Sequence, residues 1–275
     1  VVLHALLLFP PRRGLQGWRV TRLDLPPIAS CLYNGLRRLA HGPGPTYLMK
    51  PLLAWVLPME VPRIVLLDTD TVVIRPIAEL WAEFDRFNGA LIGLANEQHN
   101  LYQKDSGWTL TGKNGGVQLL ELRAMRSSFK YLKLLDHYSS GHAKAYIGYL
   151  GDQTLYTHME RSAPRLFSQL GCEWNRQISL QFGFANRTVH QCFRRCGILH
   201  ANYNPLKCAA ALMQQDPSCE NWKAFQSTLR SSRSCPNRLP IPQRHMLHHA
   251  IDIFFSDCCV PAASLLPPYE RHHHF

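Results

Sequence analysis

Three features that mark common classes of protein are absent from this sequence of 275 residues. The apolar segment Val1–Pro10 is too short to cross a membrane and has no basic n-region before it, so we expect neither a membrane span nor a signal peptide within the sequence. No Cys-x-x-Cys pair occurs, which excludes the spacing of a zinc ribbon. No long run of Lys and Arg with interleaved aromatic residues occurs either, so a nucleic-acid-binding platform is not expected.

Acidic residues are scarce: 19 Asp and Glu stand against 30 Lys and Arg, which gives a formal net charge of +11. A basic protein can bind nucleic acid, anionic membranes or anionic small substrates. The positive residues are scattered in short clusters such as Arg12-Arg13 and Arg37-Arg38, which disfavours nucleic acid as a partner. Hydrophobic residues make up 46% of the chain, which is ample for the core of one large domain or of one and a half.

The most informative segment is Ile64–Asp70, an apolar run that ends in two carboxylates one residue apart, Asp68 and Asp70. Four consecutive apolar residues predict a strand that is covered on both faces in an α/β sheet. Ligands of such sheets bind beyond the carboxyl ends of strands. Two carboxylates there repel each other unless a cation lies between them, and hard oxygen ligands suit Mg²⁺ or Mn²⁺. The alternative interpretation is a strand-end turn with solvated aspartates.

Apolar periodicity predicts alternating helices and strands around this segment. The expected strands are Arg63–Leu67, Ala90–Ala95, Gly116–Leu122, Arg165–Leu170 and Gly197–His200, with a short one at Gly17–Val20. The expected helices are Met49–Leu57, Pro76–Phe87, Arg123–Tyr138 and a further one at Asp152–Met159, for which Asp152 is the expected N-cap. This alternation is typical of an α/β sheet with covering helices.

An ordered series of short motifs accompanies the Asp-x-Asp segment. The motifs are Tyr47–Leu53, Ile77–Trp81, Asn114–Val117, Gly151–Gln153, Cys172–Asn175 and His200–Asn202. In this order and spacing, residues 18–207 resemble the glycosyltransferases of family 8, and among them the xylosyltransferase domain of the LARGE-type enzymes. The resemblance implies the GT-A fold, which is a Rossmann-like α/β sheet. It also implies a retaining, metal-dependent transfer of a sugar, with xylose favoured, from a UDP-sugar to a glycan or glycoprotein.

The same resemblance implies a role for each matching residue. Mn²⁺, with Mg²⁺ as the alternative, is expected at Asp68, Asp70 and His200, since a histidine added to two carboxylates suits Mn²⁺ better. Asp152 is expected to bind sugar hydroxyls at the catalytic centre, and Gln153 to lie near the anomeric carbon. The other residues expected to bind the UDP-sugar are Lys50, Thr69, Asn114, Gly115, Asn202 and Lys207. Glu97 and the pair Trp174-Asn175 are expected at the acceptor side.

Four positions depart from the family pattern. Gly115 stands where the family has Ser or Thr, which opens space beside the donor sugar, and Thr154 stands where LARGE-type enzymes have Asp. Lys207 follows His200 by seven positions, where the family usually has six. The family's opening strand, which cradles uracil, has no counterpart in Val1–Pro10, so we expect a GT-A fold that lacks its first strand or rebuilds its base-binding wall.

The chain has nine cysteines, eight of them in its second half, which favours disulfides in an oxidising compartment over reduced cytosolic thiols. Asn186-Arg187-Thr188 is a sequon for N-glycosylation, which agrees with secretion. LARGE-like enzymes are Golgi type II membrane proteins. The resemblance therefore implies the Golgi or the lumen of the secretory pathway, with an anchor upstream of this sequence.

The character of the chain changes after Cys208, where Ser/Arg-rich, Pro-rich and His-rich stretches follow one another. We therefore expect a GT-A domain at residues 1–208 and an irregular extension containing Cys, His and Pro at residues 209–275. Other functions stay open at this point. One is a catalytically inactive relative that acts as a binding protein, and another is a glucosyl- or galactosyltransferase of the same family. The third is a basic module that binds nucleic acid or glycan.

Overall fold

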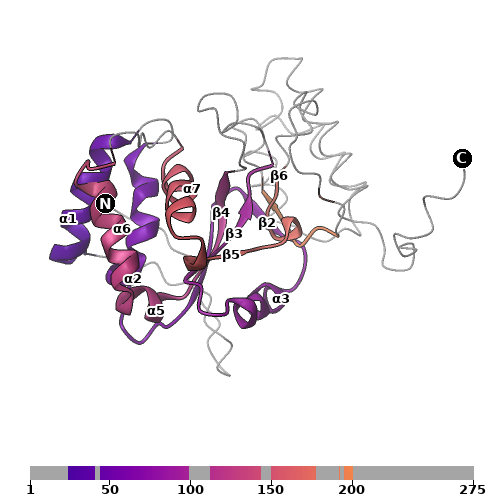
Figure 1. Ribbon diagram of the computed structural model, residues 1–275. Coiled ribbons are helices and arrows are strands. Elements are labelled where there is room, and N and C mark those ends of the chain that lie inside the picture. The colour runs from indigo at the N-terminus through magenta and orange to yellow at the C-terminus, as the bar shows by residue number, and fades with distance from the viewer. Residues whose placement is uncertain are drawn as a thin grey trace, which may run out of the picture.

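The computed structural model describes residues 24–40, 44–98, 112–143, 150–177, 192 and 195–200, which form two β-sheets and their covering helices (Figure 1). The larger sheet has the strand order β1 (Ile64–Leu67), β4 (Lys113–Leu120), β3 (Ile92–Asn96), β5 (Phe167–Gln169). Strand β4 runs antiparallel to both β1 and β3, and β3 runs parallel to β5. The smaller sheet has the order β2 (Thr71–Val73), β7 (Ile198–His200), β6 (Arg176–Gln177).

Five helices gather beside the larger sheet, and α3 lies apart from them (Figure 1). The five are α1 (Pro27–Leu36), α2 (Leu53–Val56), α5 (Leu122–Ser127), α6 (Phe129–Ser139) and α7 (Asp152–Ser162). Helix α3 (Ile77–Trp81) continues into a 3₁₀ helix, Ala82–Arg86. Among the described residues, no helix has the length and apolar character that a membrane crossing requires.

The larger sheet is buried on both faces. Ile64, Leu66, Ile92, Leu94 and Leu120 belong to the core shared with the five helices, whereas Val65, Ala95, Val117 and Leu119 pack on the opposite side with Leu80, Phe84, Trp174 and Ile198. Successive residues of a strand point to opposite faces, so a strand covered on both sides must be apolar at every position. This confirms the prediction for the apolar run before Asp68, although β1 is antiparallel to its neighbour.

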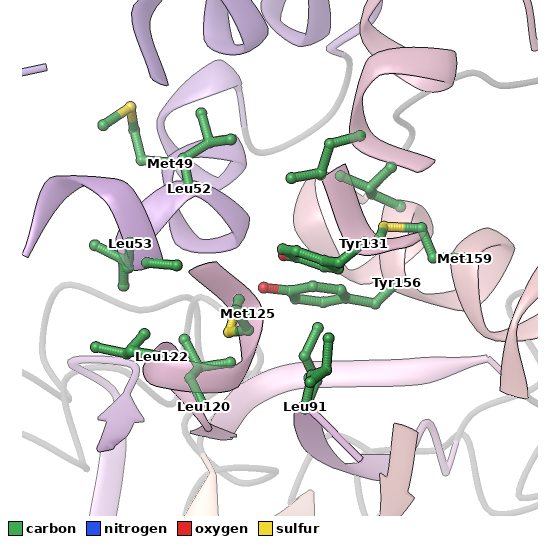
Figure 2. Close-up of a cluster of buried hydrophobic side chains, with 14 of the residues drawn as sticks. Met49, Leu52, Leu53, Leu91, Leu120, Leu122, Met125, Tyr131, Tyr156 and Met159 are labelled. Atoms are coloured by element: carbon green, nitrogen blue, oxygen red, sulfur yellow. The ribbon is translucent and has the colours of Figure 1, made fainter. Parts of the chain in front are cut away.

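The core between the helices and the sheet is built around two tyrosines. Figure 2 shows Tyr131 of α6 and Tyr156 of α7 among the leucine and methionine side chains of this cluster. Both rings are fully buried, and the hydroxyl of Tyr131 donates to the carbonyl of Pro51 at 2.8 Å. Burial raises the pKa of both phenols, so both hydroxyls stay protonated.

Three of the expected helices have different boundaries or character. The segment expected as helix Met49–Leu57 is a 3₁₀ helix, Pro45–Leu52, followed by the short α2, because Pro51 has no N–H to donate within an α-helix. The helix expected at Arg123–Tyr138 is broken at Ser128, whose side chain accepts from the backbone N–H of Tyr131 and caps α6. Pro76 is the N-cap of α3 and not its first residue.

The start of α7 also differs from the prediction. Asp152 is the first helical residue, and the N-cap is Gly151, whose φ of 60° lies in a region that favours glycine. Asp152 is therefore not the N-cap, and its side chain lies near Gln118 and Lys50. The short strand expected at Gly17–Val20, the base-binding wall and the extension at residues 209–275 lie outside the described residues.

The expectation of disulfide bonding is confirmed at one pair. Cys172 and Cys192 are joined, with a Cα–Cα distance of 5.7 Å, and the bond ties the chain before β6 to the chain before β7. Among the other described cysteines, the exposed Cys31 and the buried Cys196 are free thiols. A disulfide of this kind is typical of an oxidising compartment.

Candidate functional site

The Asp-x-Asp segment is a turn that connects the two sheets. The backbone N–H of Asp68 donates to the carbonyl of Gly116 on β4 at 2.8 Å, which continues the ladder of β1 by one residue. The carbonyl of Asp68 accepts from the backbone and hydroxyl of Thr71, at 3.1 and 2.7 Å. These bonds hold Asp68 and Asp70 at the junction of the sheets, while Thr69 between them is exposed.

His200 joins the two aspartates from strand β7. It lies opposite Thr71 in the antiparallel ladder of β2 and β7. Its Nε2 is 3.4 Å from Oδ1 of Asp70 and 4.0 Å from Oδ2 of Asp68, and one ligand atom from each residue lies within 4.8 Å of the others. Two carboxylate oxygens and an imidazole nitrogen are a donor set consistent with a divalent metal site.

Glycine at position 116 is required for this arrangement. A Cβ built on Gly116 would overlap the ring of His200, so any other residue would push the imidazole away from the two aspartates. The sequence motif Asn114-Gly115-Gly116 therefore has a steric role at its last position, which is to let β4 approach the histidine closely.

A chain of hydrogen bonds fixes the orientation of the His200 ring. The backbone N–H of Gly116 donates to Oδ1 of Asn114 at 2.9 Å, and a backbone amide can only donate, so this atom of Asn114 is the oxygen. The Nδ2 of Asn175 donates to the same oxygen at 2.8 Å, which directs Oδ1 of Asn175 to Nδ1 of His200 at 3.0 Å. Nδ1 therefore carries the proton, and Nε2 presents its lone pair to the aspartates.

Glu97 connects this chain to Gln153. Its Oε2 accepts from Nδ2 of Asn114 at 3.0 Å and from Nε2 of Gln153 at 2.7 Å, and Oε1 of Gln153 accepts from the backbone of Gly115 at 3.4 Å. Glu97 and Asn175 are 2% and 0% exposed, so both lie inside a buried hydrogen-bond network. The sequence predicted them at the acceptor side of the site. Trp174 is likewise buried, in the core.

Lys50 lies between two carboxylates. Its Nζ is 2.6 Å from Oδ1 of Asp68 and 3.6 Å from Oδ2 of Asp152, and it donates to the carbonyl of Gly115 at 3.0 Å. Burial acts to lower the pKa of Lys50, but the charges of Asp152 and Asp68 together outweigh burial and raise it. Lys50 is therefore a buried cation shared by two anions.

Asp152 enters the same site from the first turn of α7. It is 2% exposed, and its Oδ2 accepts from Nε2 of Gln118 at 2.6 Å. Burial raises its pKa to about 6, although Lys50 and the Gln118 amide act in the opposite direction. A Cβ built on Gly115 would lie 2.7 Å from Oδ2 of Asp152, so the space expected beside Gly115 is filled by this carboxylate.

Most of the residues singled out in the sequence lie around this junction. They are Lys50, Asp68, Thr69, Asp70, Asn114, Gly115, Asp152, Gln153 and His200. Asn202 and Lys207 lie outside the described residues. Thr154, which replaces an Asp of the LARGE-type pattern, accepts from the backbone N–H of Leu150 at 2.9 Å through its hydroxyl and so stabilises the entry to α7.

Sequence reasoning missed the role of Gln118. The residue is fully buried on β4 and donates both to Asp152 and, at 2.9 Å, to the carbonyl of Gly115. The available signal was a single amide side chain inside the otherwise apolar run Val117–Leu120. A buried polar side chain in such a run requires a hydrogen-bond partner.

Comparison with known proteins identifies relatives of this chain. No family model matches it. It is 36% identical to mouse xyloside xylosyltransferase 1 over 177 residues, which cover 54% of this chain and 44% of that protein. It is 32% identical to human xylosyl- and glucuronyltransferase LARGE1 over 165 residues, which cover 56% of this chain and 21% of that protein. The chain thus spans less than half the length of these two relatives.

The fold has a counterpart among solved structures. The crystal structure of mouse xyloside xylosyltransferase 1 in its apo form matches with a TM-score of 0.53 and 28% identity. The match covers 64% of this chain and 74% of that chain. The predicted α/β GT-A fold is therefore confirmed, together with the resemblance on which it was based.

The raised pKa of Asp152 predicts how its replacement by asparagine changes stability with pH. The folded state binds the proton of the Asp152 carboxyl more tightly than the unfolded state does. The stabilisation that this proton gives is therefore fully present below 3.8, the pKa of the unfolded chain, and is lost as pH rises through about 6. We expect metal-free Asp152→Asn to be more stable than the parent above pH 6, by up to about 3 kcal/mol, with the difference vanishing near pH 4.

Denaturant unfolding in EDTA, between about pH 4 and about pH 7.5, measures this difference. Asp85→Asn is the matched control, because it makes the same change at an exposed position and should keep the parental pH profile. Parallel profiles for Asp152→Asn and the parent would contradict the assignment of the raised pKa to Asp152.

Proposed function

We propose that the chain is a family 8-like glycosyltransferase, because it has the GT-A fold and is similar to xyloside xylosyltransferase 1 and the LARGE enzymes. The reaction we propose is transfer of xylose from UDP-xylose to a glycan or glycoprotein. The observation that carries the proposal is the group of Asp68, Asp70 and His200 at the junction of the sheets. It lies next to a buried cation, Lys50, and to Asp152 at a helix start.

The residues present fit a divalent metal. Asp68, Asp70 and His200 would hold Mn²⁺, which accepts an imidazole ligand beside carboxylates more readily than Mg²⁺ does. When bound, the metal neutralises negative charge on the leaving diphosphate. The orientation of His200 supports this role, since its Nδ1 is engaged by Asn175 and its Nε2 faces the aspartates.

The remaining residues act on the donor. Lys50 supplies a fixed positive charge near the diphosphate, with Lys207 and Asn202 proposed to contribute from the segment after β7. Asp152 accepts hydrogen bonds from sugar hydroxyls, and the Gln153 amide lies at the anomeric carbon. Thr69, Asn114 and Gly115 line the donor pocket.

The mechanism we propose is retaining, with the acceptor hydroxyl attacking on the same face that the UDP leaves. Asp152 is the carboxylate that we propose to contact the sugar, and it is held by Gln118 and Lys50. A carboxylate held in this way is suited to orienting the sugar and not to forming a bond with it. The leaving group is stabilised by the metal and Lys50, so departure of UDP and arrival of the hydroxyl need no protein nucleophile.

Xylose is favoured over a hexose for a physical reason as well as by kinship. The space beside Gly115, which would widen the pocket for a C6 group, is occupied by the carboxylate of Asp152. The disulfide Cys172–Cys192 supports an oxidising compartment, and we propose the Golgi or another part of the secretory lumen.

Replacing Asp70 by asparagine tests the metal site. We expect Asp70→Asn to lose the Mn²⁺-dependent stabilisation by UDP, while its unfolding temperature in EDTA stays close to that of the parent, because neutralising one of two like charges removes repulsion. Thermal-shift titration with UDP, with and without Mn²⁺, measures both. Asp85→Asn should respond to UDP as the parent does, and normal Mn²⁺-dependent UDP binding by Asp70→Asn would refute the site.

Replacing Asn175 by leucine tests the orientation of His200. The change keeps a similar volume but removes the acceptor for Nδ1–H, so the ring loses its fixed tautomer. We expect Mn²⁺ affinity to fall by about 10- to 100-fold. Titration calorimetry gives the affinity, and nitrogen chemical shifts of His200 report the tautomer. Unchanged affinity together with a changed tautomer would show that Asn175 has no role in metal binding.

The identity of the donor is tested by comparing hydrolysis of UDP-xylose, UDP-glucose and UDP-galactose in Mn²⁺. We expect the highest kcat/KM for UDP-xylose, because Gly115 does not widen the site: the carboxylate of Asp152 occupies the volume beside it. Faster turnover of either hexose would overturn the assignment of xylose. Tight UDP binding without any hydrolysis or transfer would instead identify an inactive, binding relative.

A further inference from the structure

Gln118 is a fully buried amide in an apolar layer of the larger sheet. In register it lies opposite Leu66 of β1 and Leu94 of β3, both of which belong to the core beneath the helices. Removing an amide from water into such surroundings is unfavourable unless its donors and acceptors find partners. A Met or Leu would fill this position without that penalty.

The amide hydrogens of Gln118 have two partners, and both belong to the site. One is Oδ2 of Asp152 at 2.6 Å, and the other is the carbonyl of Gly115 at 2.9 Å. The carbonyl of Gln118, its Oε1, has no hydrogen-bond partner among the described residues. An amide whose carbonyl has no hydrogen-bond partner adds little net stability to the fold. We therefore infer that Gln118 serves to orient its two partners, Asp152 and the carbonyl of Gly115.

Gly115 provides the room for this contact. A Cβ at position 115 would lie 2.7 Å from Oδ2 of Asp152, so a side chain there would force the carboxylate away from Gln118. The carbonyl of Gly115 also accepts from Lys50 at 3.0 Å. The bare backbone at Gly115 and the amide of Gln118 therefore hold Asp152 and Lys50 in one fixed relation.

We propose that Gln118 is a positioning residue for the donor sugar, acting through Asp152. This inference rests on the proposed function of the site. Gln118 occupies one oxygen of the carboxylate, and the remaining acceptor positions of Asp152 are then presented to the sugar hydroxyls in a single orientation. Gly115 and Gln118 act as a pair, because the amide reaches the carboxylate only where position 115 has no side chain.

The test separates the sugar from the nucleotide. Gln118→Met keeps the volume and removes the amide, so affinity for UDP-xylose in Mn²⁺ should fall about tenfold while affinity for UDP stays the same, because UDP has no sugar to meet Asp152. Titration calorimetry measures both affinities. Gln169→Met is the control at an exposed position of β5, where the amide it removes accepts from Lys113 at 2.6 Å and makes no contact with Asp152, so it should not lower UDP-xylose affinity selectively.

Gly115→Ala provides a second variant with an intact Gln118. It should show the same selective loss, because its Cβ displaces the carboxylate. An equal loss of UDP and UDP-xylose affinity in Gln118→Met, or no loss in either variant, would overturn the inference.

A readout without any donor distinguishes this inference from the proposed function. The Gln118 amide holds the pKa of Asp152 down, so in metal-free Gln118→Met the pH window over which Asp152 costs stability should move to higher pH. If the pH window is the same in Gln118→Met and the parent, Gln118 does not position Asp152, and this holds whether or not the parent binds UDP. If the window moves but the parent binds no UDP, the proposed function fails, and with it the inference that the sugar is what Asp152 positions.

Discussion

One buried ammonium group holds the site together. Lys50 comes from the 3₁₀ helix before β1, and it reaches Asp68 at the end of β1 and Asp152 at the start of α7. A buried cation without partners would be costly, and two buried carboxylates without a cation would be costly too. Opposite charges in this group therefore reduce the cost of burying one another, and the three segments that carry them are tied together at this point.

The hydrogen bonds around that group allow one orientation for each side-chain amide, because every bond has a defined donor and acceptor. The backbone N–H of Gly116 requires an oxygen on Asn114, and that choice sets Asn175 and then His200. A similar chain runs from Asn114 through Glu97 to Gln153. Networks of this kind rigidify a site, since rotating any one amide would leave a buried donor facing a donor. The proposed metal ligand and the proposed donor-binding residues thus share one hydrogen-bonded frame.

Kinship and geometry support the proposed function in different ways. The relatives match little more than half of this chain, and the chain covers less than half of those proteins, so they support the kind of fold and leave the activity as a proposal. The proposed chemistry rests on the residues at the junction of the sheets. Gly115 illustrates the difference, because by sequence it opens a pocket, whereas in the fold the carboxylate of Asp152 fills that volume.

The sequence by itself determined the strand before Asp68, the Asp-x-Asp turn, the strand ending at His200 and the family resemblance. These are local patterns: an apolar run for a strand covered on both faces, and polar residues at its end. The helix boundaries were less certain, because Pro51, Ser128 and Gly151 act through backbone geometry that periodicity does not record.

Only the tertiary structure decided the partners of the buried polar residues. Gln118 is 34 residues from Asp152, and Asn175 is 25 residues from His200. No local pattern reports which distant group will satisfy a buried amide, because that depends on where the chain places both ends of the hydrogen bond.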